Sequence, residues 1–167
     1  MPKVGLRQLA HKYNVAMASI HEYPVEVDWN GGRTGSGSVT ATRSGTKASI
    51  SVPPEFNGPG NGANPEELLT CAIASCYAMT FGIIVENQKL PVSSLHVDAV
   101  GEVEQAGAQF TYRKVTLRPR ITVSPDITDE QLAKVNDMSH KADSYCIITN
   151  AVRGKVEIVV EQEIVRG

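Results

Sequence analysis

Polar and apolar residues alternate over the first third of the chain. Val25, Val27 and Trp29 alternate with charged residues, and two further runs at 36–41 and 48–52 flank a Ser-Gly turn. Alternation with a period of two residues is typical of β-strands that bury one face. These runs therefore predict an antiparallel meander at the start of the fold.

A long apolar segment follows and predicts a helix that begins at Pro65 and ends near Lys89. Asn64 suits the N-cap position, and Glu67 stands at the spacing of a capping box. Residues 68–85 carry no charge, which is the lower edge of a transmembrane signal. Acidic flanks and interspersed polar residues favour instead a central helix of a globular protein, buried on nearly all sides.

The second half of the chain alternates again and contains a second helix. Runs at 95–104 and 110–123 predict two strands, and 155–165 predicts a last strand. Thr128 caps the second helix, and Cys146 continues its apolar spacing at or just past its end. The order of three strands, a helix, two strands, a helix and a strand indicates an α+β fold with a mostly antiparallel sheet and helices covering one face.

Length, composition and charge narrow the class of protein. The 167 residues fit one domain, which we place at 25–167 after an N-terminal extension, 1–24, with a short amphipathic helix or ordered arm at 6–13. Hydrophobic residues make up 41% and charged residues 20% of the chain, and the net charge of −2 provides no basic field for nucleic acid or an anionic membrane. The four histidines lack metal-ligand spacing, so neither a metal nor a cofactor is expected. Three cysteines and the lack of a signal-peptide pattern predict a reducing cytoplasm.

Two cysteines and their surrounding motifs carry the candidate chemistry. Cys76 lies deep in the predicted long helix, in Ala-Ser-Cys-Tyr-Ala-Met, downstream of an Asn-Pro-Glu-Glu-Leu-Leu helix start. Cys146 lies in a Tyr-Cys pair with Asn-Ala-Val-Arg-Gly at 150–154 just beyond, and a Gly-Gly-Arg turn at Arg33 precedes both cysteines. With these motifs, residues 25–165 resemble the OsmC/Ohr family, the osmotically inducible and organic hydroperoxide resistance proteins.

The resemblance implies an OsmC/Ohr-like intertwined homodimer with two active sites at the subunit interface. It also implies a thiol peroxidase that reduces organic hydroperoxides, in oxidative or osmotic stress defence. By motif match, Cys76 is the expected peroxidatic cysteine, Cys146 the resolving cysteine, and Arg33 with Glu66 the pair that activates the thiol. The expected disulfide between Cys76 and Cys146 is then reduced by a dithiol, either a lipoyl-type protein or a small thiol.

The chemistry of the thiol supports a role for the arginine. A thiol with a pKa of about 8.5 is only a few per cent thiolate at neutral pH, and burial lowers that fraction. Cys76 therefore needs a cation, and Arg33 offers a planar fork that can hold a carboxylate and a thiolate together. Glu66 and Cys76 are separated by roughly 15 Å along a helix, so the arginine must close most of that distance.

Other interpretations of these residues remain open. A buried cysteine is most often a small core hydrophobe, which is the role we expect for Cys71. Arg33 is also compatible with a solvated turn residue. A different class of function is a dimeric binding protein for a hydrophobic or electrophilic small molecule, in which Cys76 and Cys146 line a pocket without turnover. A third is a structural stress-response dimer with inert thiols.

Overall fold

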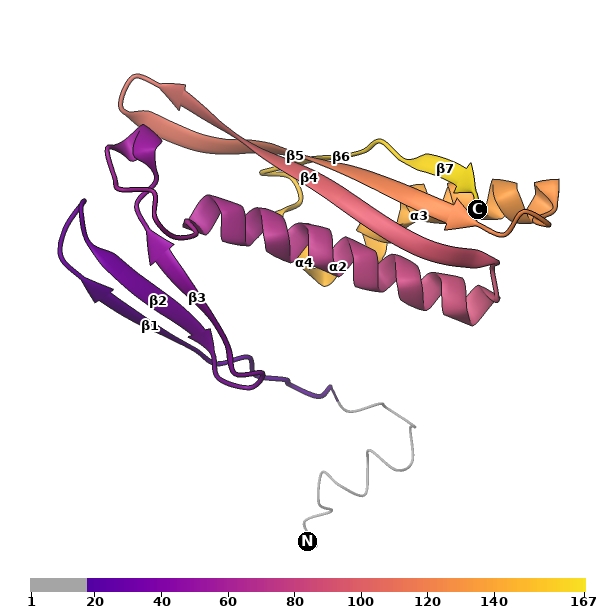
Figure 1. The fold of residues 1–167 in the computed structure, drawn as a ribbon, viewed down its shortest axis with the longest axis horizontal. Helices are drawn as coiled ribbons and strands as arrows, with labels where there is room; N and C mark the ends of the chain where they lie inside the picture. The colour runs from indigo at the N-terminus through magenta and orange to yellow at the C-terminus, as the bar shows by residue number, and fades with distance from the viewer. Residues whose placement is uncertain (1–17) are drawn as a thin grey trace, which may run out of the picture.

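The computed structural model describes residues 18–167, so the helix or arm expected at 6–13 lies outside the described residues. The expected α+β class is confirmed, with a small three-stranded sheet, a larger sheet and helices packed against the larger sheet (Figure 1). The elements in chain order are β1 (Val25–Asn30), β2 (Ser36–Ala41), β3 (Thr46–Ser51), η1 (Pro54–Phe56), α2 (Pro65–Gln88), β4 (Val92–Ala106), β5 (Gln109–Val123), α3 (Asp129–Tyr145), α4 (Ile147–Val152), β6 (Glu157–Val160) and β7 (Glu163–Arg166).

Strands β1, β2 and β3 form the predicted antiparallel meander. Figure 1 shows this sheet projecting away from the larger sheet, to which it is joined through η1 and the start of α2. Val25 and Val27 of β1 are exposed even though they alternate with charged residues. The apolar face that the sequence pattern predicts therefore has no cover within the described part of one chain.

The larger sheet is organised around β5. Strands β4 and β5, of 15 residues each, pair antiparallel, and β6 and β7 both pair with β5 in parallel. The prediction of a single last strand over 155–165 was wrong. The Glu161 amide still donates to the Leu117 carbonyl at 2.9 Å, the ladder is then interrupted, and the chain rejoins β5 at Glu163 in the same register.

Helix α2 begins and ends as its sequence predicts. The Asn64 side chain accepts from the Glu67 amide at 2.8 Å, the Glu67 carboxylate accepts from the Asn64 amide, and Lys89 ends the helix in the left-handed conformation with φ 51°. Its buried residues recur every four positions, at Ile73, Tyr77 and Phe81. They form one face, which packs with β5 and α3 into the common core.

The expectation that α2 is buried on nearly all sides was wrong for the single chain. Only 17% of its most apolar stretch of 18 residues is buried, and Met79 and Ile83 are exposed. The physical reason is that β4, β5, α3 and α4 cover one side of the helix and none of the described elements covers the other. By length and composition, α2 is the one described helix that could cross a membrane.

Helix α3 also starts at its predicted cap, because the Thr128 hydroxyl accepts from the Gln131 amide at 3.2 Å. A further short helix, α4, follows it directly and was not predicted. The two helices meet at Cys146, whose φ of −72° and ψ of 120° interrupt the helical backbone. This junction places Cys146 against α2.

Candidate functional site

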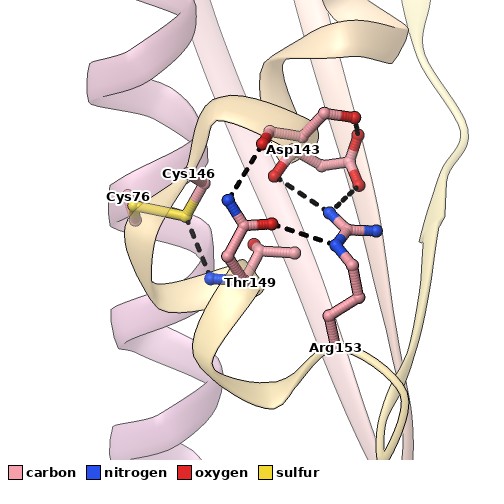
Figure 2. A network of polar contacts seen from close by, with 7 residues as sticks. Cys76, Asp143, Cys146, Thr149 and Arg153 are labelled. Atoms are coloured by element: carbon pink, nitrogen blue, oxygen red, sulfur yellow. Dashed lines mark hydrogen bonds and ion pairs between the residues drawn. A yellow bond between two sulfur atoms is a disulfide. The ribbon is translucent and has the colours of Figure 1, made fainter.

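Cys76 and Cys146 are joined in a disulfide, with their Cα atoms 5.7 Å apart (Figure 2). Cys76 comes from the middle of α2, and Cys146 comes from the junction of α3 and α4. Cys146 is 0% exposed, whereas Cys76 is partly exposed. The disulfide thus joins one buried cysteine to one that is partly exposed.

Tyr77, the residue after Cys76, fixes the distance between α2 and α3. Tyr77 is fully buried, and its hydroxyl donates to the Ser139 carbonyl of α3 at 2.9 Å. Burial, and secondarily the negative charge of Asp143, raises the pKa of Tyr77 well above that of an exposed tyrosine. The phenol therefore remains a hydrogen-bond donor at neutral pH and ties α2 to the helix that leads to Cys146.

Cys146 serves as a cap for both adjoining helices. Its amide donates to the Asp143 carbonyl at 3.2 Å, which closes α3. Its Sγ accepts from the Thr149 amide at 3.3 Å, which satisfies one free donor at the start of α4. The backbone on both sides therefore determines where this sulfur lies.

Arg153 connects the two ends of this junction (Figure 2). Its Nε donates to the Asn150 side chain at 3.0 Å, and its NH2 group donates to the Asp143 carboxylate at 3.1 Å and to the Asp143 carbonyl at 3.3 Å. Asn150 in turn donates to the Ser144 carbonyl at 2.9 Å. We call these four residues the junction clamp. The sequence showed Arg153 only as part of the Asn-Ala-Val-Arg-Gly stretch, without a role.

Arg33 and Glu66 do not meet in the described chain. Arg33 is exposed in the β1–β2 turn, which Gly31 makes possible with a φ of 93°, and within residues 18–167 it forms no ion pair or side-chain hydrogen bond. Glu66 lies in the first turn of α2, and its Oε2 atom is buried without a hydrogen-bond partner among the described residues. The carboxylate is therefore left with unused hydrogen-bonding capacity.

A hollow of about 750 Å³ lies beside Glu66, between the start of α2, η1 and the β4–β5 hairpin. Its walls include Cys71 and Tyr112 but neither Cys76 nor Cys146. Cys71 is a free, exposed thiol, so the prediction that it is a small core residue was wrong for the single chain. The binding-protein interpretation, in which both disulfide cysteines line a pocket, does not fit this hollow.

Comparison with known proteins assigns the family. The profile of the OsmC-like protein family matches residues 58–161, which include α2, both disulfide cysteines and the junction clamp. The chain belongs to the OsmC-like family. The family resemblance in the sequence is thereby confirmed, and the matched segment lies inside the domain expected at 25–167.

Relatives by sequence include proteins of several bacteria. The uncharacterized protein YmaD of Bacillus subtilis is 33% identical over 88% of this chain and 97% of its own length. The organic hydroperoxide resistance protein of Xanthomonas axonopodis pv. citri is 25% identical over 83% of this chain and 92% of its own length.

Solved structures share the fold. An organic hydroperoxide resistance protein OsmC from Legionella pneumophila aligns with a TM-score of 0.68 at 22% identity, covering 86% of this chain and 99% of its own. One from Elizabethkingia anophelis aligns with a TM-score of 0.66 at 23% identity, covering 88% and 99%. At these identities the likeness establishes the architecture, and the chemistry must be inferred from the residues of this chain.

Proposed function

We propose that the protein is a thiol peroxidase that reduces organic hydroperoxides to alcohols. The observation that carries the proposal is the disulfide between partly exposed Cys76 and buried Cys146. A peroxidatic cysteine must be reached by substrate, and a resolving cysteine must be held near it. The similarity to proteins named for organic hydroperoxide resistance supports this class of substrate.

The proposed cycle has three steps. The Cys76 thiolate attacks one peroxide oxygen, the O–O bond breaks, and the alkoxide takes a proton and leaves as the alcohol, which converts Cys76 into a sulfenic acid. The Cys146 thiolate then attacks the Cys76 sulfur, the S–S bond forms, and the hydroxyl group leaves as water after protonation. An external dithiol donates two electrons and two protons to restore both thiols and becomes a disulfide itself.

Activation of Cys76 is assigned to Arg33 and Glu66. The arginine supplies the positive charge that stabilises the thiolate and the developing alkoxide, and the carboxylate orients the arginine. The unpartnered buried oxygen of Glu66 and the exposed, unpaired guanidinium of Arg33 within residues 18–167 support such a pairing. Their separation in one chain means that the site is completed by movement of the β1–β2 turn or by a second subunit.

The proposal includes a homodimer with active sites at the subunit interface. Exposed apolar residues on two separate elements support it, because a second copy would cover them: Val25 and Val27 on β1, and Met79 and Ile83 on α2. The remaining partners are an organic hydroperoxide and a dithiol, either a lipoyl-type protein or a small thiol. The proposed location is the cytoplasm, where thiols are kept reduced.

The test is consumption of cumene hydroperoxide and of hydrogen peroxide with dihydrolipoamide as the electron donor. We expect fast loss of the organic peroxide with the wild type, none with Cys76→Ser, and a fall of about 10²-fold with Arg33→Ala, typical of losing a group that stabilises developing charge. Arg118→Ala is the matched control. This exposed arginine of β5 pairs with Glu161 and makes none of the contacts described around the two cysteines. Equally slow turnover by wild type and Cys76→Ser with every donor would contradict the peroxidase and leave a binding role.

A further inference from the structure

We propose that Arg153 is a positioning residue: through Asp143 and Asn150 it holds Cys146 where this cysteine bonds to Cys76, and it thereby sets the stability of the disulfide. The inference deepens the proposed function and rests on it for the role of Cys146 as the resolving cysteine. Its physical basis is the junction clamp, which joins the chain before Cys146 to the chain after it (Figure 2).

The junction of α3 and α4 needs an external restraint. Cys146 alone separates the two helices, and its backbone is extended. Helix α4 has only six residues, which is too short to be stable without tertiary contacts. The neighbouring Tyr145 and Ile147 are exposed, so packing of these side chains does not fix the junction within the described chain.

Arg153 supplies that restraint with two nitrogens of its guanidinium. Nε holds Asn150 inside α4, and NH2 holds the carboxylate and carbonyl of Asp143 in the last turn of α3. The Asp143 side chain is only 14% exposed, whereas the carboxylates of the other arginine pairs in the described chain are at least half exposed. Reduced solvation strengthens the attraction, so this ion pair is worth more than a typical surface pair.

Positioning of Cys146 affects both formation and cleavage of the disulfide. A thiol held at its partner has a high effective concentration, which favours the bonded state and speeds its formation. In cleavage, an incoming dithiol reaches partly exposed Cys76 rather than buried Cys146. The S–S bond then breaks with its electron pair on Cys146, whose Sγ accepts the Thr149 amide hydrogen bond, and that thiolate takes a proton. A second attack within the mixed disulfide frees Cys76 and oxidises the dithiol.

The experiment compares Arg153→Gln with a matched variant, Arg118→Gln. The two arginine side chains are equally exposed, at 49% and 50%, and each forms an ion pair, but Arg118 pairs with Glu161 rather than with the α3–α4 junction. Each protein is equilibrated in mixtures of reduced and oxidised dithiothreitol, the thiols are alkylated, and the oxidised fraction is measured by intact-protein mass spectrometry.

We expect Arg153→Gln to shift the exchange constant towards the reduced protein by about tenfold, which is about 30 mV for this two-electron couple. Arg118→Gln is expected to match the wild type. The exchange constant of Arg153→Lys should lie between those of the wild type and Arg153→Gln. One ammonium group can pair with Asp143 but cannot also donate to Asn150 as the planar guanidinium does. Equal exchange constants for Arg153→Gln and Arg118→Gln would overturn the inference.

Two further measurements keep the test decisive. If Arg153→Gln fails to fold, as judged by circular dichroism, Asp143→Asn removes the charge without changing the shape of the side chain, and an unchanged exchange constant in it would equally refute the clamp. The exchange constant needs no peroxide, so a shift in protein that does not consume hydroperoxide would support the clamp while the peroxidase proposal fails. In an active enzyme, Arg153→Gln should also accumulate more Cys76 sulfinic acid, because slower bonding to Cys146 leaves the sulfenic acid exposed for longer.

Discussion

Replacement of Tyr77 by phenylalanine tests how α2 is held against α3 at the disulfide. The variant keeps the buried ring, which lies parallel to that of Phe81 at 6.3 Å, and removes only the hydroxyl that donates to Ser139. Loss of this hydrogen bond is expected to lower the free energy of unfolding at pH 7 by about 1 kcal/mol. For a chain of this size that corresponds to a fall in Tm of about 2–4 °C.

The effect of this substitution should depend on pH. The phenol ionises at a pKa of about 10 in the unfolded chain, whereas burial raises the pKa of Tyr77 in the folded chain. A group whose folded pKa is raised contributes stability that is complete below the unfolded pKa and is lost as pH rises towards the folded value. Above pH 10 the wild type therefore loses about 1.4 kcal/mol per pH unit relative to the variant, so the two stabilities should cross between about pH 10 and 11.

The assay is urea unfolding of both proteins at pH 7, 9, 10 and 11. Both carry Cys71→Ser, so that the free thiol cannot exchange with the disulfide at alkaline pH, and both are compared at one protein concentration. Tyr23→Phe, which removes an exposed phenol, is the control for losing one ionisable group. A stability difference that is the same at pH 11 as at pH 7 would refute the assignment of a buried, neutral Tyr77.

Three further predictions concern single side chains. Asn64→Ala removes the capping box of α2 and should cost about 1 kcal/mol of stability in urea unfolding, whereas Asn64→Asp, which can still cap, should cost less. Cys146→Ser should leave the Cys76 sulfenic acid without its partner, so that dimedone labels the variant after one equivalent of cumene hydroperoxide but not the wild type; no label in either protein would contradict the resolving role. Ile121→Ala opens a cavity at a fully buried position near the end of β5 and should cost about 2–5 kcal/mol, and a loss below 1 kcal/mol would show that this core is not packed as described.

The sequence predicted those features that depend on local chemistry. Asn64 and Thr128 were expected to cap the two long helices, and both capping boxes form, because a cap requires only residues within one helical turn. The strands between 25 and 52, and those expected at 95–104 and 110–123, also form, because alternation with a period of two residues is a local property of the sequence.

Features that depend on distant contacts were not predicted. The helical spacing continues through Cys146, so the pattern did not reveal that the backbone breaks there and starts α4. Residues 155–165 contain neither glycine nor proline, and the interruption at 161–162 falls opposite Pro119 on β5, which has no amide hydrogen to donate to the ladder. Exposure of one side of α2 was missed because hydrophobicity alone does not distinguish cover by the same chain from cover by another.

The candidate site was only partly accessible to sequence reasoning. Family resemblance suggested that Cys76 and Cys146 pair, and the structure joins them. The roles of these cysteines, and of Arg33 and Glu66, stay predictions until turnover is measured. The contribution of Arg153 could not be inferred from spacing, because its bonds to Asp143 depend on the bend between two helices.

The two kinds of pairing on β5 have a consequence for how the chain acquires its structure. Strand β5 meets β4 through a short turn at 107–108, but it meets β6 and β7 only after the chain has passed through α3 and α4. Short loops close with less loss of entropy than long ones, so the β4–β5 hairpin should assemble first and the returning strands last. Because Cys146 lies at the end of α3, beyond that hairpin, we expect its thiol and that of Cys76 to remain apart while the hairpin assembles. A newly synthesised chain is therefore expected to contain a redox pair only after α3 has packed against α2.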